Sequence, residues 1–194
     1  NTVRVIVNNS LEPNCRWYSG SGIYRPVQLV IREKNHISQV HIETVDIHPA
    51  KIKVDVQTTQ PSKVLVDVFE GKRLIASGAP GILEIPDAKL WSPENPFLYD
   101  FVLELSKDGA VCDSVKGYFG MRKYSIGEYG GYKRLFLNNE PYFQRGLLDQ
   151  GYWSDGGMTP PTDEAMIYDI AKMKELGFNM LRKHIKIEPE YFYT

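Results

Sequence analysis

The sequence predicts a mainly β protein, in which an immunoglobulin-like antiparallel β-sandwich precedes a strand–helix–strand unit. Residues 37–126 contain about seven short segments of alternating apolar and polar residues, with no helical period. This pattern is typical of a sandwich whose strands each bury one face. Residues 136–186 instead read as strand, loop, helix and strand, the order that opens a parallel sheet or barrel.

The first 34 residues contain two segments with the pattern of strands. Val3, Val5 and Val7 would share one face of an extended chain, and residues 27–31 form a second apolar run. Two strands cannot bury a core by themselves. We therefore expect residues 1–34 to be the remnant of a larger β domain or an edge added to the next one.

Three of the predicted sandwich strands have an apolar residue at every second position. The alternating rows are Ile52, Val54 and Val56; Val64, Val66 and Val68; and Phe101, Leu103 and Leu105. Residues Val111 to Phe119 return as a further strand, and Ile82, Leu83 and Ile85 supply a shorter one. Asp108-Gly109 predicts a tight hairpin turn between the Phe101 row and the strand at Val111, because Gly adopts positive φ readily. The cysteine and tryptophan spacing of an antibody domain is absent, so the prediction concerns architecture alone.

After residue 136 the apolar residues no longer alternate throughout, and a segment with helical spacing appears. Asn138-Asn139 predicts a turn, and the Gly- and Pro-rich residues 150–161 predict a loop. A helix should begin behind the N-cap Thr162 and end at Gly177. Its apolar stripe is Met166, Ile170 and Met173, widened by Ile167 and Leu176. The flanking strands are expected at Tyr142–Leu148, which ends at Asp149, and at Phe178–Leu181, with polar residues crowded behind the second.

Composition excludes several classes of protein. With 42% hydrophobic and 24% charged residues, the 194-residue chain should fold. A net charge of −1 argues against nucleic acid or an anionic membrane as a partner, and no apolar run approaches the roughly 20 residues that cross a bilayer. Cys15 and Cys112 are too few for a disulfide scaffold, and whether they pair stays open.

No cofactor or metal site is predicted, because the histidines of the predicted strands have no companion carboxylates. These histidines are His36, His41 and His48. The chain begins with Asn1 and not Met, and both ends look cut, so the sequence does not indicate a cellular compartment.

Three motifs in order along the chain resemble one family. They are Arg16-Trp17-Tyr18-Ser19-Gly20-Ser21-Gly22-Ile23-Tyr24-Arg25, then Leu90-Trp91-Ser92-Pro93-Glu94-Asn95-Pro96-Phe97-Leu98-Tyr99, then Gly120-Met121-Arg122 with Phe136-Leu137-Asn138-Asn139-Glu140-Pro141-Tyr142-Phe143-Gln144-Arg145-Gly146. Together they are similar to glycoside hydrolase family 2, which includes β-galactosidases, β-glucuronidases and β-mannosidases.

The resemblance implies three parts of a longer enzyme. Residues 1–34 would end a jelly-roll sugar-binding sandwich, residues 35–126 would be the immunoglobulin-like domain, and residues 127–194 would open a (β/α)8 barrel. The aromatic residues Trp17, Tyr18 and Tyr24 are expected to pack at the junction of sandwich and barrel, and Trp91 to anchor a core or an interface.

The resemblance also implies hydrolysis of O-glycosyl bonds with retention, using two glutamates near the ends of the fourth and seventh barrel strands. The 194 residues end after the second strand, so we expect no catalytic residue here and no activity from this fragment. Asn139-Glu140 spells the pair that carries the family's acid/base, but it lies in a turn before the first barrel strand. We interpret Glu140 as an exposed turn carboxylate.

Five residues are candidate substrate-binding groups. Arg182 matches the family's Asn-x-x-Arg at the end of the second strand, whereas His184 follows it by two residues and the family's His by three. Asp149 ends the first strand, and Tyr152 and Trp153 could stack on a sugar ring. Alternatives stay open: a structural ion pair for Arg182, a packed His184, and a core anchor for Trp153. Lys186 is a candidate only through its place at the strand end.

The sequence-based hypothesis is thus a piece of a glycosidase whose partner is a β-glycoside, with a homo-oligomer of the parent protein left open. The rival hypothesis is a non-catalytic β-sandwich carbohydrate-binding or adhesion module with a small appended α/β piece. The sequence does not specify the sugar or the linkage.

Overall fold

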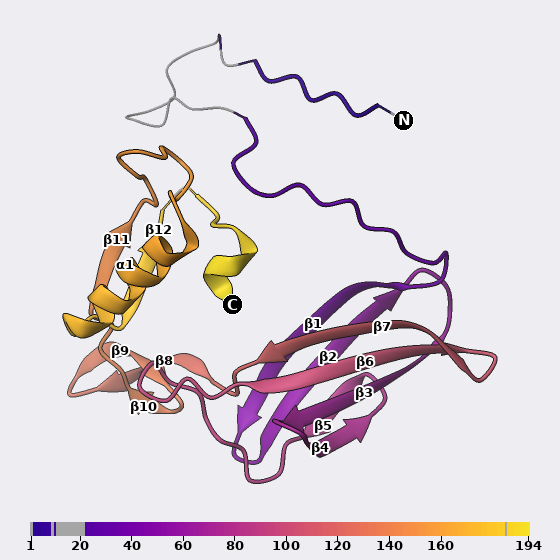
Figure 1. Cartoon of the computed structure of the whole chain (residues 1–194). Coiled ribbons are helices and arrows are strands. Elements are labelled where there is room, and N and C mark those ends of the chain that lie inside the picture. Colours follow the sequence, from indigo (N-terminus) through magenta and orange to yellow (C-terminus); the bar gives the residue numbers. More distant parts are fainter. Residues whose placement is uncertain (1, 9, 11–21, 185) are drawn as a thin grey trace. The chain divides into compact units, whose positions relative to one another are not determined.

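The computed structural model describes residues 2–8, 10, 22–184 and 186–194 (Figure 1). The chain divides into two compact units. One comprises Val30–Phe143, and the other combines Asn1–Leu29 with Gln144–Thr194.

Seven strands of the first unit form two antiparallel sheets, as the sequence predicted. One sheet has the order β1 (Ile37–Ile47), β2 (Ala50–Thr58), β5 (Gly81–Glu84), and the other has the order β4 (Arg73–Gly78), β3 (Lys63–Glu70), β6 (Tyr99–Lys107), β7 (Ala110–Phe119). Strands β2 and β5 lie in one sheet and β3 and β6 in the other, so the chain crosses between sheets as it does in immunoglobulin-type sandwiches.

The alternating rows of the sequence form the core between these sheets. Ile52 and Val54 of β2 are fully buried, and so are Leu103 and Leu105 of β6. The remaining buried members of the cluster are Ile37, Ile47, Val66, Val68, Ile85, Tyr99, Phe101 and Met121. The buried apolar area is what stabilises such a sandwich, at about 25 cal/mol per Å².

Tight turns set the strand register. Asp108 (φ 53°) and Gly109 (φ 83°) form the predicted two-residue turn, which pairs Lys107 with Ala110. A further hairpin joins β8 (Tyr124–Tyr129) to β9 (Tyr132–Leu137) through two glycines of positive φ. The predicted Asn138-Asn139 turn then leads from β9 into β10 (Glu140–Pro141), with both asparagines at positive φ.

Trp91 fastens this hairpin to the end of the sandwich. Its backbone N–H donates to the Met121 carbonyl at 2.9 Å, and the Asn138 amide donates to the Trp91 carbonyl at 3.0 Å. The Arg122 guanidinium lies 4.5 Å from the centre of the Trp91 ring, a favourable cation–π geometry. Trp91 is therefore an anchor within the first unit.

The second unit contains a parallel β–α–β arrangement (Figure 1). Strand β11 (Gly146–Asp149) pairs with β12 (Met180–Lys183), and α1 (Asp163–Glu175) connects them. Thr162 caps the helix by accepting a hydrogen bond from the Ala165 N–H at 3.2 Å, and Gly177 follows the helix end with φ 86°. A short 3-10 helix, η1 (Glu190–Tyr193), ends the described chain.

Five details of the sequence-based prediction were wrong. The structure assigns no strand to residues 3–7 or 27–31. Their apolar side chains stay exposed because no strand among the described residues pairs with them; alternation alone does not supply a partner. Strands β11 and β12 begin at Gly146 and Met180, later than expected. Of the predicted helix stripe, only Met166 is buried.

Arg145 and Asn179 explain the late strand starts. The Asn179 side-chain oxygen accepts from the Arg145 N–H at 2.8 Å, and the Asn179 N–H donates to the Arg145 carbonyl at 3.0 Å. A Cβ on Gly146 would meet Met180 Cε, the mobile end of a side chain that can shift. The paired strands begin directly after the two Arg145–Asn179 hydrogen bonds.

No helix within residues 2–8, 10, 22–184 and 186–194 is both long and apolar enough to cross a lipid bilayer.

Candidate functional site at the ends of β11 and β12

The polar residues that follow β11 and β12 lie at the same edge of this parallel pair. The register pairs Asp149 with Lys183, the last residue of each strand, and the His184 N–H donates to the Asp149 carbonyl at 2.9 Å. A cleft of about 310 Å³ opens beside this edge. It is lined by Leu148, Asp149, Gln150, Gly151, Tyr152, Trp153, Met166, Asp169, Met173, Lys183, Glu188 and Phe192.

Lys183 is the central cation of this edge. Its Nζ lies 2.8 Å from Asp149 Oδ2 and 2.6 Å from Glu188 Oε1. The same ammonium lies 4.7 Å from the centre of the Phe192 ring. One lysine thus joins the strand end of β11 to the segment that follows β12.

A second lysine closes the arrangement. Lys186 Nζ lies 3.1 Å from Glu188 Oε2 and donates to the Gly151 carbonyl at 2.6 Å. The Gly151 N–H donates to Asp149 Oδ1 at 2.7 Å. Asp149, Gly151, Lys183, Lys186 and Glu188 therefore form a closed ring of contacts, which we call the charge ring.

The pKa of Lys183 reflects this pairing. Burial by itself lowers the pKa of an ammonium, but the hydrogen bonds and negative charges of Asp149 and Glu188 outweigh it and raise the pKa of Lys183 above its ordinary 10.5. A pKa that is raised in the folded state means that these contacts stabilise the fold below pH 10.5. Their contribution is lost as the pH rises through the folded-state pKa.

Asp169 of α1 faces the same cleft from the helix. Burial raises the pKa of its carboxyl above the ordinary 3.8, and the negative charge of Asp149 adds to this increase, while Lys183 opposes it. Asp169 is therefore the carboxyl of this cleft whose ionised form is disfavoured.

Arg182, a predicted substrate-binding residue, and Lys183 of the charge ring are neighbours on β12 and lie on opposite faces of it. Because side chains alternate along a strand, Arg182 points away from the face where Lys183 meets the charge ring. Arg182 is exposed, and no contact within the described part of the chain engages its guanidinium. The structural ion pair considered for Arg182 is therefore not formed with any described residue.

Asp149 and His184 are held more tightly. Both Asp149 carboxylate oxygens are engaged in the charge ring. His184 Nδ1 is buried and makes no hydrogen bond to any residue that the structure describes. Asp149 is thus built into the scaffold, while His184 keeps one unused ring nitrogen.

Tyr152 and Trp153 extend along the loop after β11. Tyr152 is exposed, and Trp153 is half-buried. The Trp153 backbone exchanges two hydrogen bonds with Gly157, at 2.8 and 2.9 Å, which closes a small loop. The indole Nε1 is buried without a hydrogen-bond partner among the described residues. Both aromatic rings line the cleft.

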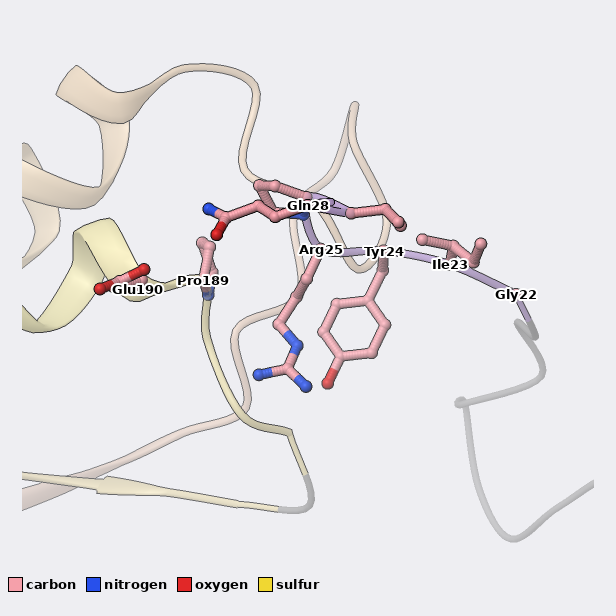
Figure 2. Close-up of a pocket in the computed structure, with 9 residues that line it drawn as sticks. Gly22, Ile23, Tyr24, Arg25, Gln28, Pro189 and Glu190 are labelled. Atoms are coloured by element: carbon pink, nitrogen blue, oxygen red, sulfur yellow. The ribbon is translucent and has the colours of Figure 1, made fainter. Parts of the chain in front are cut away.

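The N-terminal aromatic cluster is described only in part. Trp17, Tyr18 and Cys15 lie outside the described residues. Tyr24 donates to the Ile187 carbonyl at 3.1 Å, and Arg25 lies 5.6 Å from the centre of the Tyr24 ring. Figure 2 shows these two side chains in a hollow of about 500 Å³ that Pro189 and Glu190 also line.

The remaining candidates form no site. Glu140 is exposed and pairs with Leu137 beside the Asn138-Asn139 turn. No group of three His, Cys, Asp or Glu residues that could hold a metal ion occurs in the described chain. Cys112 is a free thiol there, whose Sγ lies 3.5 Å from the Leu105 carbonyl.

Sequence reasoning missed one of the two acids of the charge ring. Glu188 was not singled out, although it is among the most buried charged residues described. Lys186 and Glu188 alternate with Ile187, so both charges fall on one face of an extended chain. The surface pair Lys53–Asp55 has the same spacing, so the spacing indicates a shared face and not burial.

Comparison with known proteins identifies the sandwich. Residues 31–122 match the model of glycosyl hydrolases family 2. A putative β-glucuronidase of Formosa agariphila is 30% identical over all of this chain, and a β-glucuronidase of Streptococcus agalactiae is 25% identical over 91% of it. A β-galactosidase of Lactococcus lactis is 29% identical over 84%. The chain spans only 16–29% of the length of these relatives.

Solved structures show the same fold. A β-glucuronidase from Ruminococcus gnavus in complex with D-glucuronic acid superimposes with a TM-score of 0.74 at 22% identity, covering 82% of this chain and 28% of that one. The family match, the agreement of several relatives and the shared sandwich fold point the same way. The sandwich at residues 31–122 is therefore that of glycosyl hydrolases family 2.

Proposed function

We propose that this chain is part of a retaining β-glycosidase, to which it contributes the immunoglobulin-like support domain and one wall of the sugar-binding subsite. The observation that carries the proposal is the parallel β11–β12 pair, whose C-terminal edge gathers polar residues. Barrel enzymes place their chemistry at this edge, and the sandwich before it belongs to a glycosidase family.

The proposal assigns three parts. Residues 1–34 are the end of a sugar-binding sandwich, residues 35–126 the immunoglobulin-like domain, and residues 127–194 the opening of a (β/α)8 barrel. In this assignment α1 is the first barrel helix. The family match at residues 31–122 supports the middle part, and the β–α–β order supports the third.

Arg182, His184, Tyr152 and Trp153 are the proposed sugar contacts. The Arg182 guanidinium is exposed and can donate paired hydrogen bonds to sugar hydroxyls or to a carboxylate. Tyr152 and Trp153 offer flat apolar faces on which a pyranose can stack. Asp149 acts indirectly in this proposal, because its carboxylate is engaged by Lys183 and Gly151.

Retaining hydrolysis needs a general acid/base carboxyl and a nucleophilic carboxylate about 5–5.5 Å apart. We place both outside these 194 residues, on later strands of the barrel. The fragment alone should therefore bind sugars weakly and hydrolyse none. As substrate class we propose β-glycosides, with β-glucuronides tested first, because two of the three curated relatives described above are β-glucuronidases.

An assay of two proteins tests the proposal. The first is this 194-residue chain, and the second is the longer polypeptide that contains it. On aryl β-glucuronides, β-galactosides and β-mannosides, the longer protein should release aryl alcohol, and the first sugar product seen by NMR should keep the β configuration. The fragment should release none. Turnover by the fragment, or inversion by the longer protein, would contradict the proposal.

A substitution tests Arg182 in the longer protein. Arg182→Ala should lower kcat/KM by roughly a hundredfold, since loss of a positioning contact has an effect of that order. Arg134→Ala is the matched control, because Arg134 is an exposed arginine of the β9 hairpin; its kcat/KM should stay within twofold. Equal effects on kcat/KM at both positions would contradict the assignment of Arg182 to the sugar-binding subsite.

The rival function, a non-catalytic carbohydrate-binding or adhesion module, predicts a different result. The longer protein would then bind saccharides in calorimetry without hydrolysing any aryl glycoside.

A further inference from the structure

The charge ring connects the two loops that carry the proposed sugar contacts. Asp149 and Gly151 open the loop that continues into Tyr152 and Trp153, whereas Lys186 and Glu188 lie in the segment that follows His184. Two short contacts reach the first loop, Lys183–Asp149 at 2.8 Å and Lys186–Gly151 at 2.6 Å, and Lys183–Glu188 at 2.6 Å joins the end of β12 to the second loop. Displacing either loop therefore breaks at least one charged contact.

Burial shows that these charges hold geometry. The side chains of Lys186 and Glu188 are 1% and 2% exposed. Burying a charged pair carries a desolvation penalty that its attraction often only offsets, and an apolar pair of the same volume can be as stable. What the apolar pair cannot provide is the hydrogen bond from Lys186 to the Gly151 carbonyl. The ring thus contributes more to the placement of the loops than to stability.

Gly151 fits this interpretation. Its φ is 61°, and a Cβ there would overlap Glu188 Oε1 and come within 3.0 Å of Lys186 Nζ and 3.2 Å of Lys183 Nζ. The backbone of the β11 loop is thus pressed against the charged groups, with no space for a side chain. A loop placed this closely can direct the next two residues, Tyr152 and Trp153.

We propose that Lys183, Lys186 and Glu188 are positioning residues, which hold the Tyr152–Trp153 loop against the end of β12 and so place its two aromatic side chains for the sugar. This inference rests on the proposed function. The residues do not touch the substrate; they act through the Asp149–Gly151 turn.

The test uses the double variant Lys186→Met/Glu188→Met in the longer protein. It removes both buried charges, keeps the volume and leaves the net charge unchanged. The matched control is Lys172→Met/Glu175→Met, which removes an exposed lysine–glutamate pair of α1 with a 2.7 Å contact. Thermal unfolding confirms that both variants fold.

Two measurements then decide the proposal. Amide hydrogen exchange in residues 149–157 should become about tenfold faster in the ring variant and stay unchanged in the control. The KM for the aryl glycoside should rise about tenfold, with kcat changed less than threefold, because the loop would sample misplaced positions. Unchanged exchange in a folded ring variant, or a KM equal to that of the control, would overturn the proposal.

Failure of the proposed function gives a different signature. If the longer unmodified protein hydrolyses no β-glycoside, the result contradicts both the proposed function and the role of the ring in sugar binding. Hydrogen exchange still reports whether the ring orders the loop, because that measurement needs no substrate.

Discussion

The two units of this chain are ordered by different forces. The sandwich buries apolar residues in rows, and its ion pairs, such as Lys53–Asp55, lie at the surface. In the β–α–β unit, Met166 is the one apolar residue described as buried, whereas Lys186 and Glu188 are buried charges. One unit is thus held by non-directional burial, and the other by a few directed contacts.

The difference has a functional meaning. Apolar packing tolerates substitutions of similar volume, which suits a support domain. Directed contacts fix the positions of a few atoms, which suits a binding edge. The unit that is proposed to present side chains to a ligand is also the one that buries the charged residues Lys186 and Glu188.

The largest expected effect comes from the sandwich core. Leu103→Ala should lower the free energy of unfolding of the sandwich by about 2–5 kcal/mol, since Leu103 is fully buried and its truncation leaves a cavity. Urea denaturation followed by tryptophan fluorescence measures it. Leu74→Ala on β4, where the leucine is half exposed, should cost less than about 1 kcal/mol. Equal losses would mean that burial does not dominate this unit.

An intermediate effect is expected at Gly151. Gly151→Ala and Gly177→Ala both place a Cβ at positive φ, which by itself costs about 1–3 kcal/mol. Only at residue 151 does the Cβ also meet the charge ring, because open space surrounds residue 177. Gly151→Ala should therefore destabilise the β–α–β unit by roughly 1 kcal/mol more, measured by hydrogen exchange in β11 and β12. A larger loss of stability at residue 177 would mean that contact with the charge ring does not make residue 151 more sensitive to an added side chain.

The smallest expected effect concerns Asp169. Its pKa is raised in the fold, so the protonated form is preferred there, and stability falls as the pH rises from 3.8 through the folded-state pKa. Asp169→Asn should therefore stabilise the unit by a few tenths of a kcal/mol at pH 7. The gain should vanish as the pH approaches 3.8, in thermal melts at both values. A gain in stability that grows on acidification would mean that folding lowers the pKa of Asp169 instead of raising it.

The sequence was sufficient for elements whose signals are local. Thr162 and Gly177 delimit α1 because capping depends on neighbouring residues. Asp108-Gly109 forms its turn because two positive φ angles suit those residues. Strands β2, β3 and β6 were predictable because their rows of alternating residues report a buried face.

Features that depend on distant partners were less predictable. Residues 3–7 carry a strand pattern without a paired strand in the described chain, since pairing is a property of two segments. The charge ring joins Asp149 to Glu188 across α1, and no local pattern connects them. For the candidate site, the sequence predicted that polar residues gather where the two strands end, but it ended the second strand at Leu181, whereas β12 continues to Lys183.

The bond from Tyr24 to the Ile187 carbonyl joins two segments that are far apart in the sequence but belong to one unit. This contact closes a loop of chain that contains the whole sandwich. The entropy of closing such a loop grows only with the logarithm of its length. A complete domain between the two contacting segments therefore adds little to the thermodynamic penalty of bringing them together.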